Sequence, residues 1–154
     1  MSDNNTPSVL LMLAENEFNI GTLYTQYAKK INDKNVLWDL YAHDEFKHSK
    51  WVRSLDELAE KGLIKYNPKR INKNAIKTMA NFIRDLNYQA SVKCPGTLKA
   101  LSNAVSIETS LLERKFFEAL ESDSDKFTEI VSAIHSETEK HLLEILHLFK
   151  KYQK

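Results

Sequence analysis

The sequence predicts an all-α fold, an antiparallel four-helix bundle with a long, partly helical connector between its second and third helices. Apolar residues recur at steps of three and four along most of the 154-residue chain, which is the period of an amphipathic helix. Only three Gly and three Pro are present, too few for the many turns of a β-sandwich. The length and the 42% apolar content suit one domain, residues 1–154, with a sizeable core.

The first two predicted helices form a hairpin. The first opens with Thr6 as N-cap and Pro7 at the first helical position, where the missing N–H of proline does no harm. It ends at the polar residues 32–35. The second helix covers residues 36–61 and stops at Gly62, a residue suited to the left-handed conformation that follows a helix.

The second half of the chain predicts another hairpin after a long connection. The connector, residues 63–96, keeps helical spacing over residues 76–90 and so contains a helix of its own. The third main helix covers residues 97–120, and a turn at residues 122–125 leads into a last helix that continues to Tyr152. A connector of this length can cross the whole bundle. An irregular all-α domain of five helices is the alternative, because it uses the same signals.

A Glu and a His stand three positions apart on the apolar stripe of the second helix. These are Glu45 and His48, in the segment Glu45-Phe46-Lys47-His48. Burying a carboxylate and an imidazole without partners costs several kcal/mol, whereas a metal ion would satisfy both. In bundles that hold two metals, Glu-x-x-His on a helix is the recurring ligand unit.

The other three main helices also carry a candidate ligand near the middle of a buried stripe. Glu17 lies on the first helix, Glu108 on the third and His141 on the fourth, each flanked by apolar residues at helical spacing. Buried carboxylates repel one another unless protons or cations neutralise them. We therefore expect these residues to meet Glu45 and His48 in the bundle centre and to bind two metal ions.

The layout resembles the rubrerythrin branch of the ferritin-like di-iron carboxylate proteins over nearly the whole chain. The residues that carry the resemblance are Glu17, Tyr24, Glu45, His48, Glu108 and His141. The resemblance implies a ferritin-like fold and two iron ions, with Mn or Zn as substitutes. It makes Glu17 and His48 terminal ligands of one metal and Glu45 a bridge, and it assigns Glu108 and His141 to the second metal.

Two positions depart from the family pattern. Thr138 stands where the family has a second bridging Glu, and Glu137 or Glu144 is the candidate substitute ligand. Leu111 stands where typical rubrerythrins carry an extra Glu that supports peroxidase chemistry. The single cysteine, Cys94, excludes a four-cysteine rubredoxin domain, so electrons would come from an external donor.

The resemblance implies a di-metal redox enzyme that reacts with peroxide or oxygen, as a peroxidase or ferroxidase, with Tyr24 as a further catalytic candidate. The alternatives are a di-iron hydroxylase of a larger substrate and a non-catalytic bundle with a degenerate site. The net charge of +1 argues against a nucleic-acid surface. With one cysteine and no leader or membrane segment expected, the sequence favours the cytoplasm. Apolar residues off the main stripes predict a homodimer; they are Trp51, Phe117, Leu142 and Phe149.

Overall fold

A computed structural model describes residues 8–69, 71–114 and 122–154 of the chain. Its five helices are α1 (Val9–Lys30), α2 (Trp38–Glu60), α3 (Lys73–Val92), α4 (Thr97–Arg114) and α5 (Asp125–Tyr152). The described residues contain no strand, so the predicted all-α class is confirmed. Within the same residues, none of the helices combines the length and the apolar character needed to cross a membrane.

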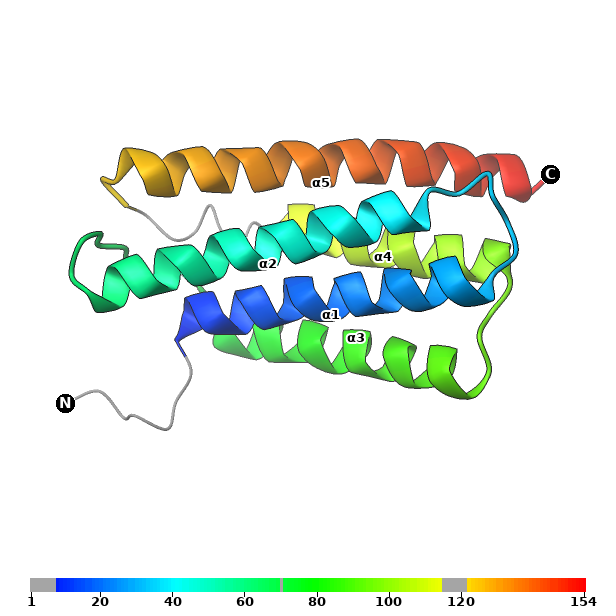
Figure 1. Ribbon diagram of the computed structural model, residues 1–154, viewed down its shortest axis with the longest axis horizontal. Coiled ribbons are helices and arrows are strands. Elements are labelled where there is room, and N and C mark those ends of the chain that lie inside the picture. Colours follow the sequence, from blue (N-terminus) through cyan, green and yellow to red (C-terminus); the bar gives the residue numbers. More distant parts are fainter. Residues whose placement is uncertain (1–7, 70, 115–121) are drawn as a thin grey trace.

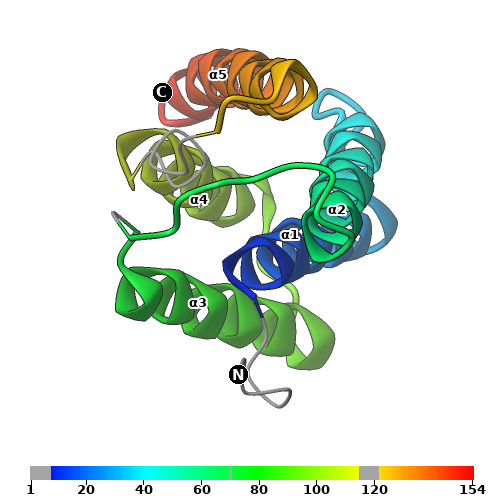
Figure 2. The same ribbon diagram turned by 90° about the vertical axis from the view of Figure 1, so that its left-hand side faces the viewer.

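The chain runs as two antiparallel helical hairpins joined by a helical return (Figure 1). Helices α1 and α2 form the first hairpin, and α4 and α5 form the second. Between them α3 carries the chain back along the length of the molecule, as predicted for the long connector. Seen end-on, α1, α2, α4 and α5 surround the centre, and α3 lies beside α1 on the side opposite α5 (Figure 2).

The first helix begins at Val9 and takes its cap from Ser8, whose hydroxyl accepts a hydrogen bond from the Leu11 N–H at 3.1 Å. The same hydroxyl donates to Asp56 at 2.6 Å and so ties the start of α1 to the end of α2. The predicted cap Thr6 and first helical residue Pro7 lie outside the described residues. The predicted third main helix, residues 97–120, is described as far as Arg114.

The end of α2 follows the prediction. Gly62 has a φ of 72°, in the left-handed region that glycine adopts without steric cost. The Gly62 N–H bonds the Ala59 carbonyl at 3.0 Å, and the Leu63 N–H reaches back to Leu58 at 2.9 Å. These two bonds complete a Schellman motif and satisfy carbonyls that the helix leaves unpaired.

The connector helix α3 is a full element of the core. It buries one apolar stripe, which contains the predicted Ile76, Met79, Ile83, Leu86 and Ala90. Polar side chains also hold it to α1, because Asn87 donates to the Asn19 carbonyl at 2.9 Å and Lys30 to the Ala90 carbonyl at 2.8 Å. Helix α3 is therefore fixed along the first hairpin.

A glycine sets the close approach of α1 and α2. A Cβ placed on Gly21 would lie 2.8 Å from Cε1 of Phe46, closer than packed atoms come. Gly21 follows Glu17 by one helical turn, and Phe46 is adjacent to Glu45. The contact therefore brings the two helices together at the level of the candidate ligands.

Candidate metal centre

Five polar side chains from four helices meet in the core. Helix α1 supplies Glu17, α2 supplies Glu45 and His48, α4 supplies Glu108, and α5 supplies His141; each is at most 2% exposed. They form two groups, Glu17–Glu45–His48 and Glu45–Glu108–His141, and in each the candidate ligand atoms lie within 4.8 Å of one another. The residues that the sequence places on four separate stripes thus come together, and Glu45 belongs to both groups.

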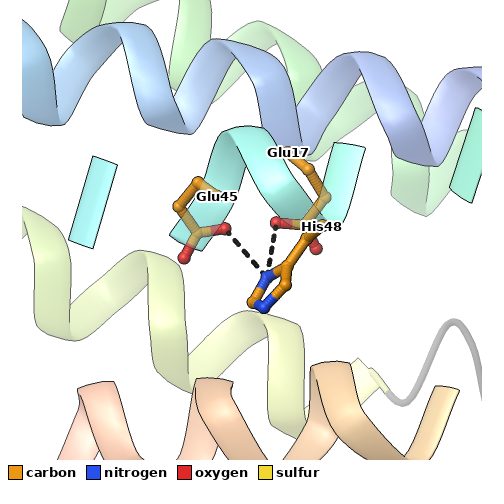
Figure 3. A group of neighbouring side chains, drawn as sticks. All are labelled: Glu17, Glu45 and His48. Atoms are coloured by element: carbon orange, nitrogen blue, oxygen red, sulfur yellow. Dashed lines mark ion pairs between the residues drawn. The ribbon is translucent and has the colours of Figure 1, made fainter. Parts of the chain in front are cut away.

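The first group is built around the inner nitrogen of His48. Figure 3 shows His48 with its Nδ1 directed toward two carboxylates, one from its own helix and one from α1. The nitrogen lies 3.7 Å from Glu45 Oε2 and 3.9 Å from Glu17 Oε2. These distances are too long for hydrogen bonds, but an ion between the three groups could contact all of them.

The second group repeats the arrangement on the other side of Glu45. The Nδ1 atom of His141 lies 3.3 Å from Glu45 Oε1 and 3.8 Å from Glu108 Oε1. The two oxygens of Glu45 are therefore nearest to different histidines. A carboxylate in this position can hold two cations at once.

Most of the polar atoms in these groups have no hydrogen-bond partner among the described residues. The unpartnered atoms are both oxygens of Glu17, both oxygens of Glu45, Oε2 of Glu108, and the Nδ1 atoms of His48 and His141. Buried polar atoms in folded proteins are nearly always paired, because an unpaired one costs about 1–3 kcal/mol and a charged one more. Seven such atoms facing one another are the pattern expected of a site that binds cations.

The outer nitrogen of each histidine is held by a carboxylate from the opposite helix. His141 on α5 places its Nε2 2.8 Å from Oδ2 of Asp44 on α2. Reciprocally, His48 on α2 contacts Oε2 of Glu137 on α5 through its Nε2. A carboxylate accepts the proton of Nε2, so it fixes the tautomer in which Nδ1 offers a lone pair to a metal.

Lys47 joins the two outer carboxylates. Its ammonium lies 2.8 Å from Glu137 Oε1 and 3.4 Å from Asp44 Oδ1. Partial burial opposes ionisation of these carboxyls, but His141 and Lys47 lower the pKa of Asp44, and Lys47 and His48 lower that of Glu137. Both outer groups are therefore anionic near neutral pH and able to accept the histidine protons.

Two tyrosines hold carboxylates at the centre and at its edge. The hydroxyl of Tyr24 donates to Oε1 of Glu108 at 2.9 Å, while Oε2 of that residue has no hydrogen-bond partner among the described residues. Burial and the nearby Glu108 charge raise the pKa of Tyr24 well above its usual value, so its hydroxyl stays protonated. Tyr41 donates to Glu144 at 3.1 Å.

The substitute ligands considered for the position of Thr138 lie elsewhere. Glu137 binds His48 and Lys47 from outside the two groups, and Glu144 is bonded to Tyr41. Thr138 itself is buried, with 3% of its surface exposed. Neither glutamate belongs to the ligand groups among the described residues.

Sequence reasoning missed Asp44 and Lys47, although the chain contains a signal for them. One five-residue pattern occurs twice in the chain. Its order is an acid, the ligand position, a variable residue, Lys and His. It reads Asp44-Glu45-Phe46-Lys47-His48 on α2 and Glu137-Thr138-Glu139-Lys140-His141 on α5. The acid that begins each pattern lies next to the ligand position of its own helix. From there it contacts the histidine on the other helix.

Without a cation, protons must balance the buried charges. Burial, together with the charge of Glu45, raises the pKa of Glu17 to about 8. Burial alone would lower the pKa of each histidine, but the surrounding carboxylates outweigh it and raise the pKa of His48 and of His141 to about 11. The site therefore holds protons at neutral pH that a divalent cation could replace.

Comparisons with known proteins add no relative: no family model, curated protein or solved structure matches the chain.

Proposed function

We propose that the chain is a di-metal carboxylate redox protein, a rubrerythrin-like member of the ferritin-like bundles, that reacts with peroxide or oxygen. The observation that carries the proposal is the set of seven buried, unpartnered oxygen and nitrogen atoms on Glu17, Glu45, His48, Glu108 and His141. Three carboxylates and two imidazoles form a donor set that suits first-row divalent metals. Iron is the proposed metal, with Mn or Zn as substitutes.

The donors divide naturally between two ions. Glu17 and His48 would hold one ion, Glu108 and His141 the other, and Glu45 would bridge them through its two oxygens. In the general pattern of di-iron bundles, two helices give a Glu each and two give Glu-x-x-His. This donor set follows the pattern except at Thr138, which replaces the second bridging Glu. When bound and reduced, such a pair of ions supplies the two electrons that reduction of peroxide requires.

The surrounding residues would prepare the site for that chemistry. Asp44 and Glu137 hold the histidine rings with Nδ1 facing inward, and Lys47 fixes both carboxylates against each other. Tyr24 holds Glu108 through one oxygen. Because the ligand side chains are almost fully buried, the protein replaces bulk water by fixed dipoles and charges around the reacting centre.

Two other functions make different predictions for the same protein. A di-iron hydroxylase would consume oxygen only with a larger substrate present, and a non-catalytic bundle would bind no metal stoichiometrically. Thr138 is the observation that favours the non-catalytic alternative, because its neutral hydroxyl replaces an anionic ligand. The external electron donor, the homodimer and the cytoplasmic location remain predictions from the sequence.

The decisive experiment begins with metal analysis of protein purified without chelator, followed by anaerobic loading with Fe(II) and rapid mixing with one equivalent of peroxide. We expect two metals per chain and fast peroxide consumption. Glu45→Ala should lose the bound metals and the peroxide consumption. Glu144→Ala should keep them, because the Glu144 carboxylate bonds Tyr41 outside the two groups.

Absence of bound metal in the wild type would refute the di-metal centre. Two bound metals that react with neither peroxide nor oxygen would refute the redox function alone. Oxygen consumption that requires an added organic substrate would favour the hydroxylase.

A further inference from the structure

The two Glu-x-x-His positions of the centre are not equivalent. Thr138 precedes His141 by three residues, as Glu45 precedes His48, so each pair lies on one face of its helix. Thr138 is 3% exposed and Glu45 is fully buried. Thr138 therefore occupies the place that corresponds to Glu45 on the opposite helix, but with a side chain that ends before a carboxylate would begin.

The missing carboxylate leaves the centre short of ligands. Each group contains only three residues, whereas divalent first-row metals commonly take four to six donor atoms. Two ions would therefore need donors beyond Glu17, Glu45, Glu108 and the two histidines.

No side chain of the described residues replaces the missing bridging carboxylate. Glu137, adjacent to Thr138, is held by His48 and Lys47, and Glu144 is held by Tyr41. Asp44 is likewise engaged, through His141. Among the described residues, the acids nearest to the position thus have other partners, which leaves the place to a ligand from outside these residues.

We propose that the centre binds the carboxylate group of a small molecule beside Thr138, in the place of the second bridging glutamate. The proposal rests on the di-metal function above. A carboxylate fits better than a spherical anion because its two oxygens can serve two ions, as those of Glu45 are placed to do. The Thr138 hydroxyl can donate a hydrogen bond to the bound group. The carboxylate belongs either to a small free acid or to a longer organic substrate.

The test uses protein loaded with Co(II), whose visible absorption reports changes in coordination without any turnover. Sodium acetate is titrated into the loaded protein at constant ionic strength, with sodium chloride as the control, and calorimetry measures the same binding. We expect a saturable spectral change with acetate and none with chloride.

Three substitutions of Thr138 separate the effect of side-chain size from the effect of side-chain charge. Thr138→Val keeps the size of the side chain and loses only the hydroxyl, so acetate binding should persist. Thr138→Glu supplies an internal carboxylate at this position, and Thr138→Gln supplies a neutral side chain of the same size. Both should weaken acetate binding by about tenfold or more, because the longer side chain takes the place that acetate would occupy. Circular dichroism of each variant confirms folding, and the Val variant keeps the test valid if the larger side chains unfold the protein.

The length of the acid identifies the source of the carboxylate. Affinity that falls from formate and acetate to octanoate indicates a small free acid, and affinity that rises along the series indicates an apolar organic substrate. Loaded wild type that ignores every acid, or Thr138→Glu protein that responds like wild type, would overturn the inference while leaving the metal centre intact. Failure to load Co(II) at all would instead refute the proposed function.

Discussion

Replacing Glu17 by Gln should raise the stability of the metal-free protein at high pH and reduce the stability that metal binding adds. Glu17 is 1% exposed, and burial with the charge of Glu45 raises its pKa to about 8. Because the folded state binds this proton more tightly than the unfolded chain, Glu17 lowers stability increasingly as pH rises from 4.5 to 8. The neutral amide of Glu17→Gln removes that cost, so the metal-free variant should melt above wild type at pH 8 and not at pH 4.

Metal should stabilise the wild type more than the variant. A ligand at one hundred times its dissociation constant stabilises the folded state by about 2.7 kcal/mol per site, or about 5 kcal/mol for two sites. For a domain of this size each kcal/mol moves the melting temperature by about 2–4 °C. Wild type should therefore gain about 10–20 °C on loading. Glu17→Gln should gain about half, because Glu17 belongs to one group and not to the other.

The assay is thermal unfolding followed by circular dichroism, with and without Co(II), at pH 4, 6 and 8. Glu15→Gln is the matched control: it lies on the same helix, but its side chain is 66% exposed and lies 3.6 Å from Arg53. Equal metal-induced shifts in the two variants would refute the assignment of Glu17 as a ligand. A metal-free Glu17→Gln protein that is no more stable than wild type at pH 8 would refute the account of its buried charge.

Three further predictions concern the protons released on metal binding, the outer carboxylate Glu137 and the packing at Gly21. Metal binding at pH 7 should release about three protons, one from each histidine and one from Glu17, because the pKa values of the histidines are raised to about 11 and that of Glu17 to about 8. Calorimetry in buffers of different ionisation enthalpy counts these protons, and release of less than one proton at pH 8 would indicate ordinary histidines. Glu137→Ala should weaken metal binding about 10–100-fold without changing the number of ions at saturation, because it removes the partner of His48; a lost ion in equilibrium dialysis would make Glu137 a direct ligand. Gly21→Ala should destabilise the fold by about 1–3 kcal/mol in urea unfolding, because its Cβ would lie 2.8 Å from Phe46. The control Gly96→Ala should keep the stability of the wild type, because a Cβ there would have no atom within 4 Å.

The sequence by itself determined the helices and the buried faces of the candidate ligands. Periodicity located all five helical segments, including the one inside the connector, and it placed Glu17, Glu45, His48, Glu108 and His141 on apolar stripes. These conclusions were accessible because a helical period is local: the spacing of residues along the chain decides which side chains share a face.

Only the tertiary structure decided which side chains meet across the helices. The crossed pairs, Asp44 with His141 and Glu137 with His48, depend on how α2 and α5 are aligned, and no spacing within either helix fixes that alignment. The sequence made Glu137 a candidate ligand because it gives the spacing of Glu137 and His141 along α5. It does not give the residues of α2 that Glu137 contacts, which are His48 and Lys47. The cap at Ser8 was likewise decided by packing, since its hydroxyl also reaches Asp56 on α2. Local spacing therefore selects the face of a helix, and the register between helices selects the partner.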